Sequence, residues 1–489
     1  MKKIILSVAL IFATSMLFAQ STATTTQTGN LQFADVNQTG SNTATVTQTQ
    51  TGTPSNSPSY MNDAKVNQSG GNGNIAIISQ DELGGGGKGG NDAKIDQIGS
   101  GNTSSQTTYA PGYNSGQDVI ALQVGSENTV TQNIQGGYTD YFYVAQNGNN
   151  NTATQNGTGV THNTARIFQD GENNTATQTL AGSNNGYYGG IYSGEKIRIQ
   201  QTGDDNIATQ TFTGSGFSHG NSADINQLGN NNTATQVGNG RNIYANFNQT
   251  GNDNNASSEQ TGNAQQVFVN QTGNDNVASS KQTGSLQQIY VDQVGNKNQA
   301  TVWQDHDGNF ADVNQNGYSD KTFINQKYGS NNSATITQNG SAGANTTFYP
   351  GVNNYAKVFQ SGANNVTNGN QTGYNNYLGT SQSQGSNNNI EATQIGNDSN
   401  FDSSYAFGTT AFGYNNYADL GQVGNENGLT LYQNGTDNYA AGAQSGDFNI
   451  GSISQNGNSN FGTLSSVGNS HGGTIIQNGN MNQSTINQN

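Results

Sequence analysis

Glutamine recurs along this chain at a spacing too regular for a random polar tract. From residue 249 onward, most glutamines of the repeat return every eleven positions. A primary amide carries both donors and an acceptor, so glutamines stacked above one another can hydrogen-bond along the stack as a ladder. The chemistry that these residues predict is therefore structural hydrogen bonding. The ladder is expected to contain Gln249, Gln260, Gln271, Gln282, Gln293, Gln304, Gln315, Gln326, Gln422, Gln433, Gln444, Gln455, Gln477 and Gln488.

A glycine lies two places after most of these glutamines and opens a short polar stretch, such as GNDN (251–254) or GNEN (424–427). Glycine and asparagine tolerate the positive φ that a tight turn needs. The spacing therefore predicts a turn after each glutamine. The turn glycines are expected to be Gly251, Gly262, Gly273, Gly284, Gly295, Gly424, Gly435, Gly446, Gly457, Gly468 and Gly479.

Residues that could do other chemistry are scattered. The four histidines are His162, His219, His306 and His471. None has a nucleophile or metal-ligand spacing beside it. The chain has no cysteine, and GGGGKGG (84–90) lacks the Lys-Ser/Thr ending of a phosphate loop. Turn carboxylates such as Asp204 and Asp253 lack the tandem phrase of calcium-binding solenoids. We expect no catalytic residue, no cofactor, no metal site and no enzymatic activity.

Alternating side chains predict short β-strands between the turns. QQVFVNQ (265–271) places Val267, Val269 and Gln271 on one face of a strand and Phe268 on the other. Similar strands at fixed spacing can stack in register, about 4.8 Å apart. The expected fold is all-β: a cross-β-like β-solenoid of strand–turn–strand repeats with loop insertions, in which each rung has about 22 residues.

The repeat is regular in some stretches and irregular in others. In the first half, pairs of glutamines nine residues apart, such as Gln97 and Gln106, alternate with longer and variable steps. Nine differs from eleven by two, so the inward face of the strand is kept. The expected solenoid covers residues 20–489 in four stretches: loop-decorated at 20–248, regular at 249–338, loop-interrupted at 339–421 and regular at 422–489.

Composition argues against an ordinary packed core and against two classes of partner. Only 30% of the 489 residues are hydrophobic, and 67 are glycine, whereas a globular domain is nearly half apolar. The formal net charge of −16 disfavours nucleic acid and anionic membranes as partners. Residues 1–19 join Lys2 and Lys3 to a mostly apolar run, which predicts a secretory signal peptide. We therefore expect an exported chain with no membrane insertion after cleavage.

The whole repeat resembles that of curlin, the subunit of bacterial curli fibres, which carries the phrase Ser-x5-Gln-x-Gly-x-x-Asn-x-Ala-x3-Gln. QTGNDNNASSEQ (249–260) is similar to this phrase from its glutamine onward, with Asn254 and Ala256 at the Asn and Ala places. The opening serine is mostly replaced by an aliphatic residue or alanine, as at Val267. The likeness extends over nearly all of residues 27–488, which is about eighteen two-strand rungs.

The resemblance implies a secreted functional amyloid. By that resemblance, the subunit leaves through an outer-membrane export pore, meets a nucleator subunit at the cell surface and polymerises with copies of itself. The product would be an extracellular fibre, or fimbrium, that supports cell adhesion and the biofilm matrix.

Two other functions fit the same fold class. A β-solenoid that does not polymerise could be a surface adhesin. An ice-binding solenoid would present outward threonine pairs on a flat stack, although other rungs carry Ser, Phe, Tyr, Asp and Lys at comparable places. Intrinsic disorder is a third possibility, which the period-two spacing opposes. The threonine pairs that suggest ice binding come from the phrase Thr-Ala-Thr, which occurs at Thr43–Thr45, Thr152–Thr154, Thr175–Thr177 and Thr233–Thr235.

Two smaller features carry expectations of their own. Glycines replace the expected alanine or aliphatic residue in the last rungs, which predicts weaker rungs that restrain premature assembly. These glycines are Gly442, Gly451, Gly462 and Gly473. Aromatic residues such as Tyr141 and Tyr143, and those of NGYYGGIY (185–192), either form an adhesive surface or stack as outward neighbours.

Overall fold

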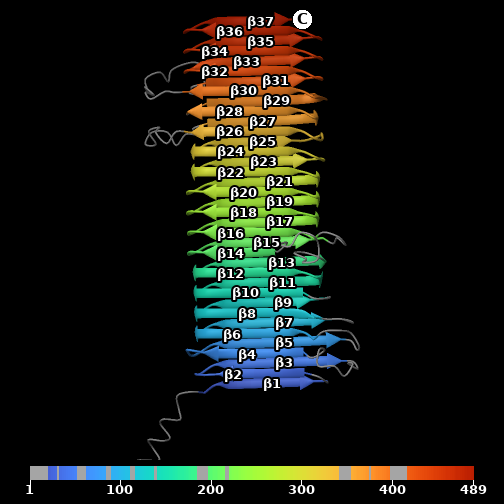
Figure 1. Ribbon diagram of the computed structural model, residues 1–489, viewed down its shortest axis with the longest axis vertical. Coiled ribbons are helices and arrows are strands. Elements are labelled where there is room, and N and C mark those ends of the chain that lie inside the picture. The colour runs from blue at the N-terminus through green and yellow to red at the C-terminus, as the bar shows by residue number, and fades with distance from the viewer. Residues whose placement is uncertain are drawn as a thin grey trace, which may run out of the picture. The chain divides into compact units, whose positions relative to one another are not determined.

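The chain folds as a β-solenoid of parallel strands, which confirms the fold class that the repeat predicts (Figure 1). It has about 17 turns of about 23 residues each. The chain forms two compact units, Met1–Ile243 and Tyr244–Asn489, and the boundary falls close to residue 249, where the repeat becomes regular. This computed structural model describes residues 20–29, 32–51, 62–83, 90–110, 116–136, 140–183, 197–214, 220–340, 354–373, 376–396 and 416–489. The expected signal peptide lies outside these residues.

The first unit contains two parallel sheets, one of odd-numbered and one of even-numbered strands. Its sheet A contains β1 (Thr22–Thr28), β3 (Thr43–Thr51), β5 (Ile75–Leu83), β7 (Thr103–Ala110), β9 (Thr129–Gln135), β11 (Thr152–Thr161), β13 (Thr175–Ser183), β15 (Ile207–Thr213) and β17 (Thr233–Arg241). Its sheet B contains β2 (Gln32–Gln38), β4 (Asn62–Ser69), β6 (Asp92–Ser100), β8 (Gln117–Ser126), β10 (Asp140–Asn149), β12 (Thr164–Glu172), β14 (Ile197–Thr202) and β16 (Ser222–Leu228).

The second unit follows the same plan. Its sheet A contains β19 (Asn255–Asn263), β21 (Val277–Ser285), β23 (Gln299–Asp305), β25 (Lys321–Gln326), β27 (Asn354–Ala363), β29 (Asn376–Ser386), β31 (Asn416–Val423), β33 (Asn438–Ser445), β35 (Phe461–Val467) and β37 (Gln483–Gln488). Its sheet B contains β18 (Tyr244–Thr250), β20 (Gln266–Thr272), β22 (Gln288–Asn296), β24 (Phe310–Tyr318), β26 (Ser333–Gly340), β28 (Val366–Gly373), β30 (Asn389–Gly396), β32 (Gly428–Asn434), β34 (Ile450–Asn456) and β36 (Gly472–Asn478).

Each strand lies in register on the strand two places later in the chain, so like residues stack on like. Gln249 of β18 pairs with Gln271 of β20, and Gln271 pairs with Gln293 of β22. Ala256 of β19 pairs in the same way with Ala278 of β21. The register follows from the period of two, because a one-residue slip would turn every inward side chain to the solvent.

The inward side chains explain how so polar a chain forms a core. A strand of the regular region typically points four side chains inward: an asparagine, an alanine or valine, a further small or aliphatic residue, and a glutamine. In β24 the last three are Ala311, Val313 and Gln315, and Asn309 precedes them; all four are buried. The hydrophobic strip is therefore narrow, and amide columns run along both of its edges. A composition of 30% hydrophobic residues suffices because the buried amides pair with one another.

Long connections follow strands of sheet A in the first unit and strands of sheet B in the second unit. In the first unit they follow odd-numbered strands, for example between β3 and β4 and between β13 and β14. In the second unit they follow even-numbered strands, as between β26 and β27 and between β30 and β31. Long insertions are therefore placed in the turns, where they leave the strand register unchanged. No helix able to cross a membrane is found among the described residues.

Candidate functional site: the amide ladders

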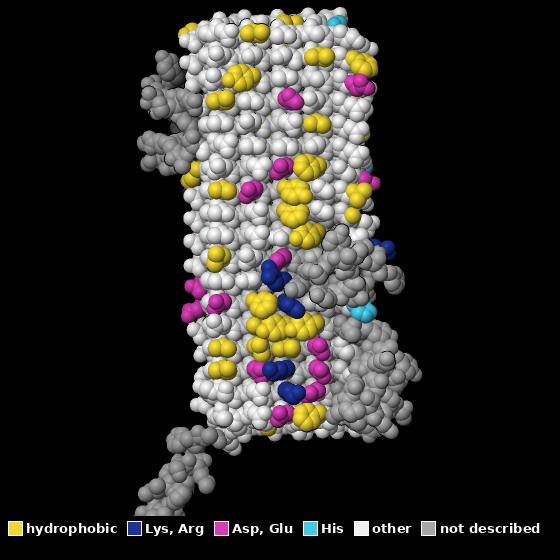
Figure 2. Space-filling view, viewed as in Figure 1, with side chains coloured by type: hydrophobic (Ala, Val, Ile, Leu, Met, Phe, Trp, Pro, Cys, Tyr) yellow, Lys and Arg dark blue, Asp and Glu magenta, His cyan; other side chains and the backbone are white. Residues whose placement is uncertain are grey.

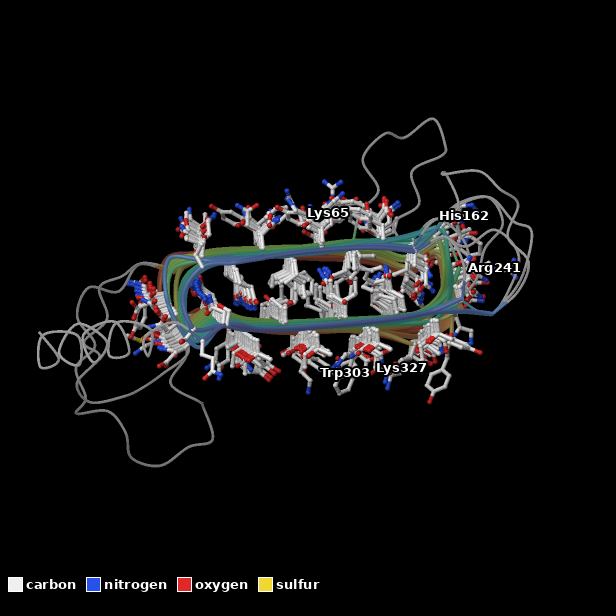
Figure 3. All side chains as sticks on the ribbon, turned by 90° about the horizontal axis from the view of Figure 1, so that it is seen from below. Lys65, His162, Arg241, Trp303 and Lys327 are labelled. Carbon is white, nitrogen blue, oxygen red and sulfur yellow. The ribbon has the colours of Figure 1, made fainter. Side chains whose placement is uncertain are left out.

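The inward glutamines form continuous hydrogen-bonded columns. Gln249 Nε2 donates to Gln271 Oε1 at 2.8 Å, and Gln271 Nε2 donates to Gln293 Oε1 at 2.9 Å. Gln271 Nε2 also donates to the backbone oxygen of Asn255, at 3.0 Å, in the facing sheet. One amide thus bonds along its own sheet and across the core. Figure 3 shows the inward side chains filling the space between the two sheets.

The structure distributes the expected ladder residues of the second unit between two columns, one in each sheet. In sheet B they are Gln249, Gln271, Gln293, Gln315, Gln433, Gln455 and Gln477. In sheet A they are Gln260, Gln282, Gln304, Gln326, Gln422, Gln444 and Gln488. Gln338, Gln371 and Gln394 continue the first column, and Gln360 and Gln382 continue the second. The regular and loop-interrupted stretches therefore share the same columns.

Asparagines form a second set of columns at the start of the strands, and their donors point the other way. Asn276 Nδ2 donates back to Asn254 Oδ1 at 3.1 Å and onward to the carbonyl oxygen of Gly295 at 2.8 Å. In the first unit, Asn102 Nδ2 likewise donates to Asn74 Oδ1 at 3.1 Å. The asparagine amides therefore fasten each strand to the turn of a neighbouring rung.

The expected turn glycines all have positive φ. Gly251 and Gly273, for example, have φ of 112° and 116°. A Cβ atom on Gly251 would overlap the carbonyl oxygen of Gly273 directly beside it in the stack. Both the backbone conformation and the close approach of successive turns therefore require glycine. The same positive φ is found at Gly262, Gly284, Gly295, Gly424, Gly435, Gly446, Gly457, Gly468 and Gly479.

Two buried carboxylates interrupt the asparagine columns, a feature that the repeat pattern did not predict. Asp140 Oδ1 accepts hydrogen bonds from the backbone N–H and Nδ2 of Asn163, at 2.8 and 3.1 Å. Its Oδ2 is buried without a partner. Asp320 accepts from Asn354 Nδ2 at 2.9 Å and from the N–H of Gly340 at 3.1 Å. Burial, only partly offset by these hydrogen bonds, raises the pKa of both Asp140 and Asp320 to about 7.

Within the two units, the ladders break at two described places. In the first unit Gln80 pairs with Thr108, whereas Gln106 pairs with Ile78 and begins a new column that continues to Gln132. The nine-residue glutamine spacing arises here, because these glutamines occupy the third inward position of the strand instead of the fourth.

The second break lies near the end of the chain, in sheet A. Ser466 replaces glutamine between Gln444 and Gln488, and the Oγ of Ser466 donates to Gln488 Oε1 at 2.9 Å. The Nε2 of Gln444 is left buried without a partner. This rung therefore lacks one of the hydrogen bonds that its neighbours form.

The core glycines of the last rungs are not simple gaps, whereas the weaker rungs and the restraint on assembly that they predict stay predictions. A Cβ on Gly451 would lie 2.5 Å from Leu464 Cδ2 and 2.8 Å from Leu429 Cδ1. A Cβ on Gly442 would lie 2.7 Å from Leu429 Cδ2. Leucines already fill the space beside these glycines. Small and large residues therefore complement one another in this narrow core.

Outward aromatic side chains stack along the sheets. Tyr377, Tyr417 and Tyr439 lie on successive strands, with ring centroids 4.7 and 5.1 Å apart and nearly parallel planes. Trp303 points away from the core, and the Nζ of Lys327 lies 5.3 Å from the centroid of its ring (Figure 3). Figure 2 shows yellow aromatic and aliphatic groups and a few charged side chains on an otherwise polar face.

Tyr141 and Tyr143, singled out in the sequence, stack at 6.3 Å, and Arg166 lies 5.1 Å from the Tyr141 ring. The aromatic stretch 185–192 lies outside the described residues.

The described histidines, His162, His306 and His471, lie between strands. No group of three or more His, Cys, Asp or Glu side chains there is placed to hold a metal ion. His306 lies in a turn with its Nδ1 3.7 Å from Asp305, and the backbone N–H of His471 donates to Asn449 Oδ1 in an asparagine column. His219 lies outside the described residues. Together, the described inward glutamines and asparagines can form hydrogen bonds with an identical rung.

This geometry defines a β-solenoid that is stacked through repeated Gln and Asn ladders. The family model for the curlin associated repeat matches residues 307–340, which include β24, β25 and β26. This match is consistent with the curlin repeat family and confirms the resemblance found in the sequence. No curated protein matches the chain. The repeat family implies an extracellular, curli-like protein, and together with the solenoid it points to a structural role instead of an enzymatic one.

Proposed function

We propose that the chain is a structural subunit of an extracellular, curli-like amyloid fibre that grows by strand stacking. The observation that carries this proposal is the identity of the rungs. Each regular rung presents its neighbour with the same backbone edge, the same glutamine and asparagine columns and the same glycine turn. A rung from a second copy could make the same bonds, so the copies would add without a new kind of contact.

The growing edge in this proposal is β37. Backbone N–H groups of outward residues donate to the following rung: Tyr439 to the Asn460 oxygen at 2.8 Å, and Phe461 to the Asn482 oxygen at 2.7 Å. The equivalent groups of β37 belong to Gln483, Thr485 and Asn487. No strand among the described residues pairs with that edge of β37. In this proposal, a second copy accepts hydrogen bonds from these donors.

The proposal includes the partners and setting that the repeat family implies. The chief partner is another copy of the chain. A nucleator subunit and an outer-membrane export pore follow from the likeness to curlin, as does a role in adhesion and the biofilm matrix. The second candidate function is a surface adhesin that remains a single solenoid, which the outward aromatic columns favour.

The test is negative-stain electron microscopy of residues 20–489, fresh and after several days at neutral pH. We expect short particles at first and long unbranched fibres later. Thr485→Pro removes an N–H from the uncovered edge without removing one that pairs with β35, so it should slow seeded elongation. Thr485→Ala is the control, because it removes the same side chain and keeps the N–H. Particles that stay one chain long would favour the adhesin.

A further inference from the structure

The Thr-Ala-Thr phrases combine into a two-dimensional array on one face of the first unit. In sheet A, Thr129, Thr152 and Thr175 stack in one outward column, and Thr131, Thr154 and Thr177 stack in the next. The same register continues through all nine strands from β1 to β17. Threonine occupies fourteen of the eighteen positions in these two columns. The exceptions are Ile75, Ile77, Ser105 and Ile207.

The array is confined to this face. In sheet B of the same unit, the corresponding outward positions carry side chains such as Lys65, Lys94, Arg166 and Asp224. In sheet A of the second unit, the first of these columns carries the tyrosine stack that includes Tyr377. Strand propensity favours threonine in every sheet alike. Propensity alone therefore does not explain an array restricted to one sheet of one unit.

The array has the regularity of a lattice. Neighbouring rungs place equivalent threonines about 4.8 Å apart, and alternate residues of one strand lie roughly 6.6 Å apart. Ladders of like side chains hold long sheets flat, against their usual twist. The amide columns beneath the threonines are such ladders: Gln132, Gln155 and Gln178 bond in series at 2.8 Å. The face therefore presents hydroxyl groups to the solvent at two fixed and repeating intervals.

The chemistry of the face suits ordered water better than any other occupant. Each threonine offers a hydroxyl that can donate and accept, beside a methyl group that orders water around it. The two columns contain no charged side chain and no aromatic ring that could stack on a sugar. A dry contact with a second copy would bury many hydroxyls, and each unpaired one carries a desolvation cost. Ordered water supplies each hydroxyl with a hydrogen-bond partner and avoids that cost.

We propose that the outward face of sheet A in the first unit binds ice. Fibre growth uses strand edges, whereas this face lies perpendicular to them. Ice binding therefore goes beyond the structural role proposed above and does not depend on it.

The experiment uses fresh chain of residues 20–489, shown by sedimentation to be monomeric before fibres form. Thermal hysteresis and partition into a slowly growing ice shell are measured. We expect the wild-type chain to shape ice and to enter the shell. Thr154→Lys with Thr177→Lys places two hydrated charges in the middle of the array and should reduce both signals to those of buffer.

Two further variants separate the face from the fold. Thr164→Lys with Ser222→Lys puts the same charges on sheet B of the same unit and should leave ice binding unchanged. Thr154→Ser with Thr177→Ser keeps the hydroxyls, removes the methyls and should weaken binding with little effect on the far-UV spectrum. A wild-type chain that neither shapes nor enters ice overturns the proposal. So does an equal loss in the sheet B variant.

Discussion

The smallest unit of this structure is an amide stacked on an identical amide. Gln293 accepts from Gln271 and donates to Gln315, so both ends of its side chain are satisfied by the same residue type. A substitution in such a column is felt by two neighbours at once. Residues that break the like-on-like rule are therefore the most informative ones to change.

Asp140 is the clearest of these residues, and it makes the stability of the first unit depend on pH. Burial raises its pKa to about 7, whereas an unfolded aspartate titrates near 3.9. The folded unit therefore holds this proton more tightly than the unfolded chain does. The resulting stabilisation is fully present below about pH 4 and is lost as the pH rises through 7; it amounts to on the order of 2–4 kcal/mol.

Asp140→Asn should remove this dependence, because an amide has no charge to bury. We expect the melting temperature of the variant to exceed that of the wild type at pH 8 and to match it near pH 4. Asp170→Asn, at an exposed outward position of the neighbouring strand β12, is the control. Equal melting temperatures for Asp140→Asn and wild type at pH 8 would show that the carboxyl group is not buried as described.

Gly451→Val tests the packing of the narrow core. The new side chain would meet Leu464 and Leu429, so the variant should lose about 1–3 kcal/mol of stability through overpacking. Gly428→Val is the matched control on β32, since nothing lies within 4 Å of a Cβ added there. Denaturant unfolding of the two variants measures the difference. A more stable Gly451→Val would restore the view that these glycines are gaps.

At the scale of the strand, each element is held mainly through its two neighbours in the same sheet. β35 contributes a poorer rung than most, because Ser466 leaves the amide of Gln444 without an acceptor. A local defect of this kind should lower the protection of the surrounding strands against hydrogen exchange.

Ser466→Gln should repair the column. Its Oε1 can accept from Gln444 and its Nε2 can donate to Gln488, which should add about 1 kcal/mol. Slower amide exchange in β33, β35 and β37 is the expected signature. Ser454→Gln, which faces outward on β34, should leave the exchange rates unchanged. If both variants slow exchange equally, the effect does not come from the ladder.

Strands could be predicted from sequence because their evidence is local. The alternation of Val267, Val269 and Gln271 marks an inward face without knowledge of any partner. Features that depend on the facing sheet or on the next rung could not be predicted. Leu429 and Leu464, which lie beside Gly451, belong to other strands, so the alternation within one strand does not reveal them. The column shift at Gln106 depends on which residue of β5 pairs with it. Asp140 occupies an asparagine position and has nearly the same shape as asparagine. The repeat pattern therefore did not indicate that this carboxylate is buried.

At the scale of the molecule, the rung is a removable part. Hydrogen-bonded glutamines in the regular stretch lie 22 residues apart. Deleting residues 277–298 removes β21 and β22 together with the turn that follows each of them, and should bring β23 onto β19 in the same register. We expect the shortened chain to keep its far-UV spectrum and nearly its full stability.

Deleting residues 277–292 is the control for that prediction. This shorter deletion joins Asn276 directly to Gln293, two residues that both point inward in the full chain. The alternation of inward and outward residues is then broken and a strand is lost, so the surrounding rungs should unfold. Limited proteolysis of both chains distinguishes the results. A 22-residue deletion that is cleaved as readily as the control would argue against independent rungs.

The opposite directions of the two amide columns have a consequence for length. The glutamine donors point toward later rungs, as from Gln249 to Gln271, and the asparagine donors point toward earlier ones, as from Asn276 to Asn254. In an α-helix, aligned peptide units add up to a macrodipole with charged ends. Here the glutamine and asparagine dipoles in one sheet point in opposite directions. The dipoles that each added rung contributes therefore largely cancel, and no large net dipole accumulates along the stack. The stack can therefore be lengthened without an electrostatic cost at its tips.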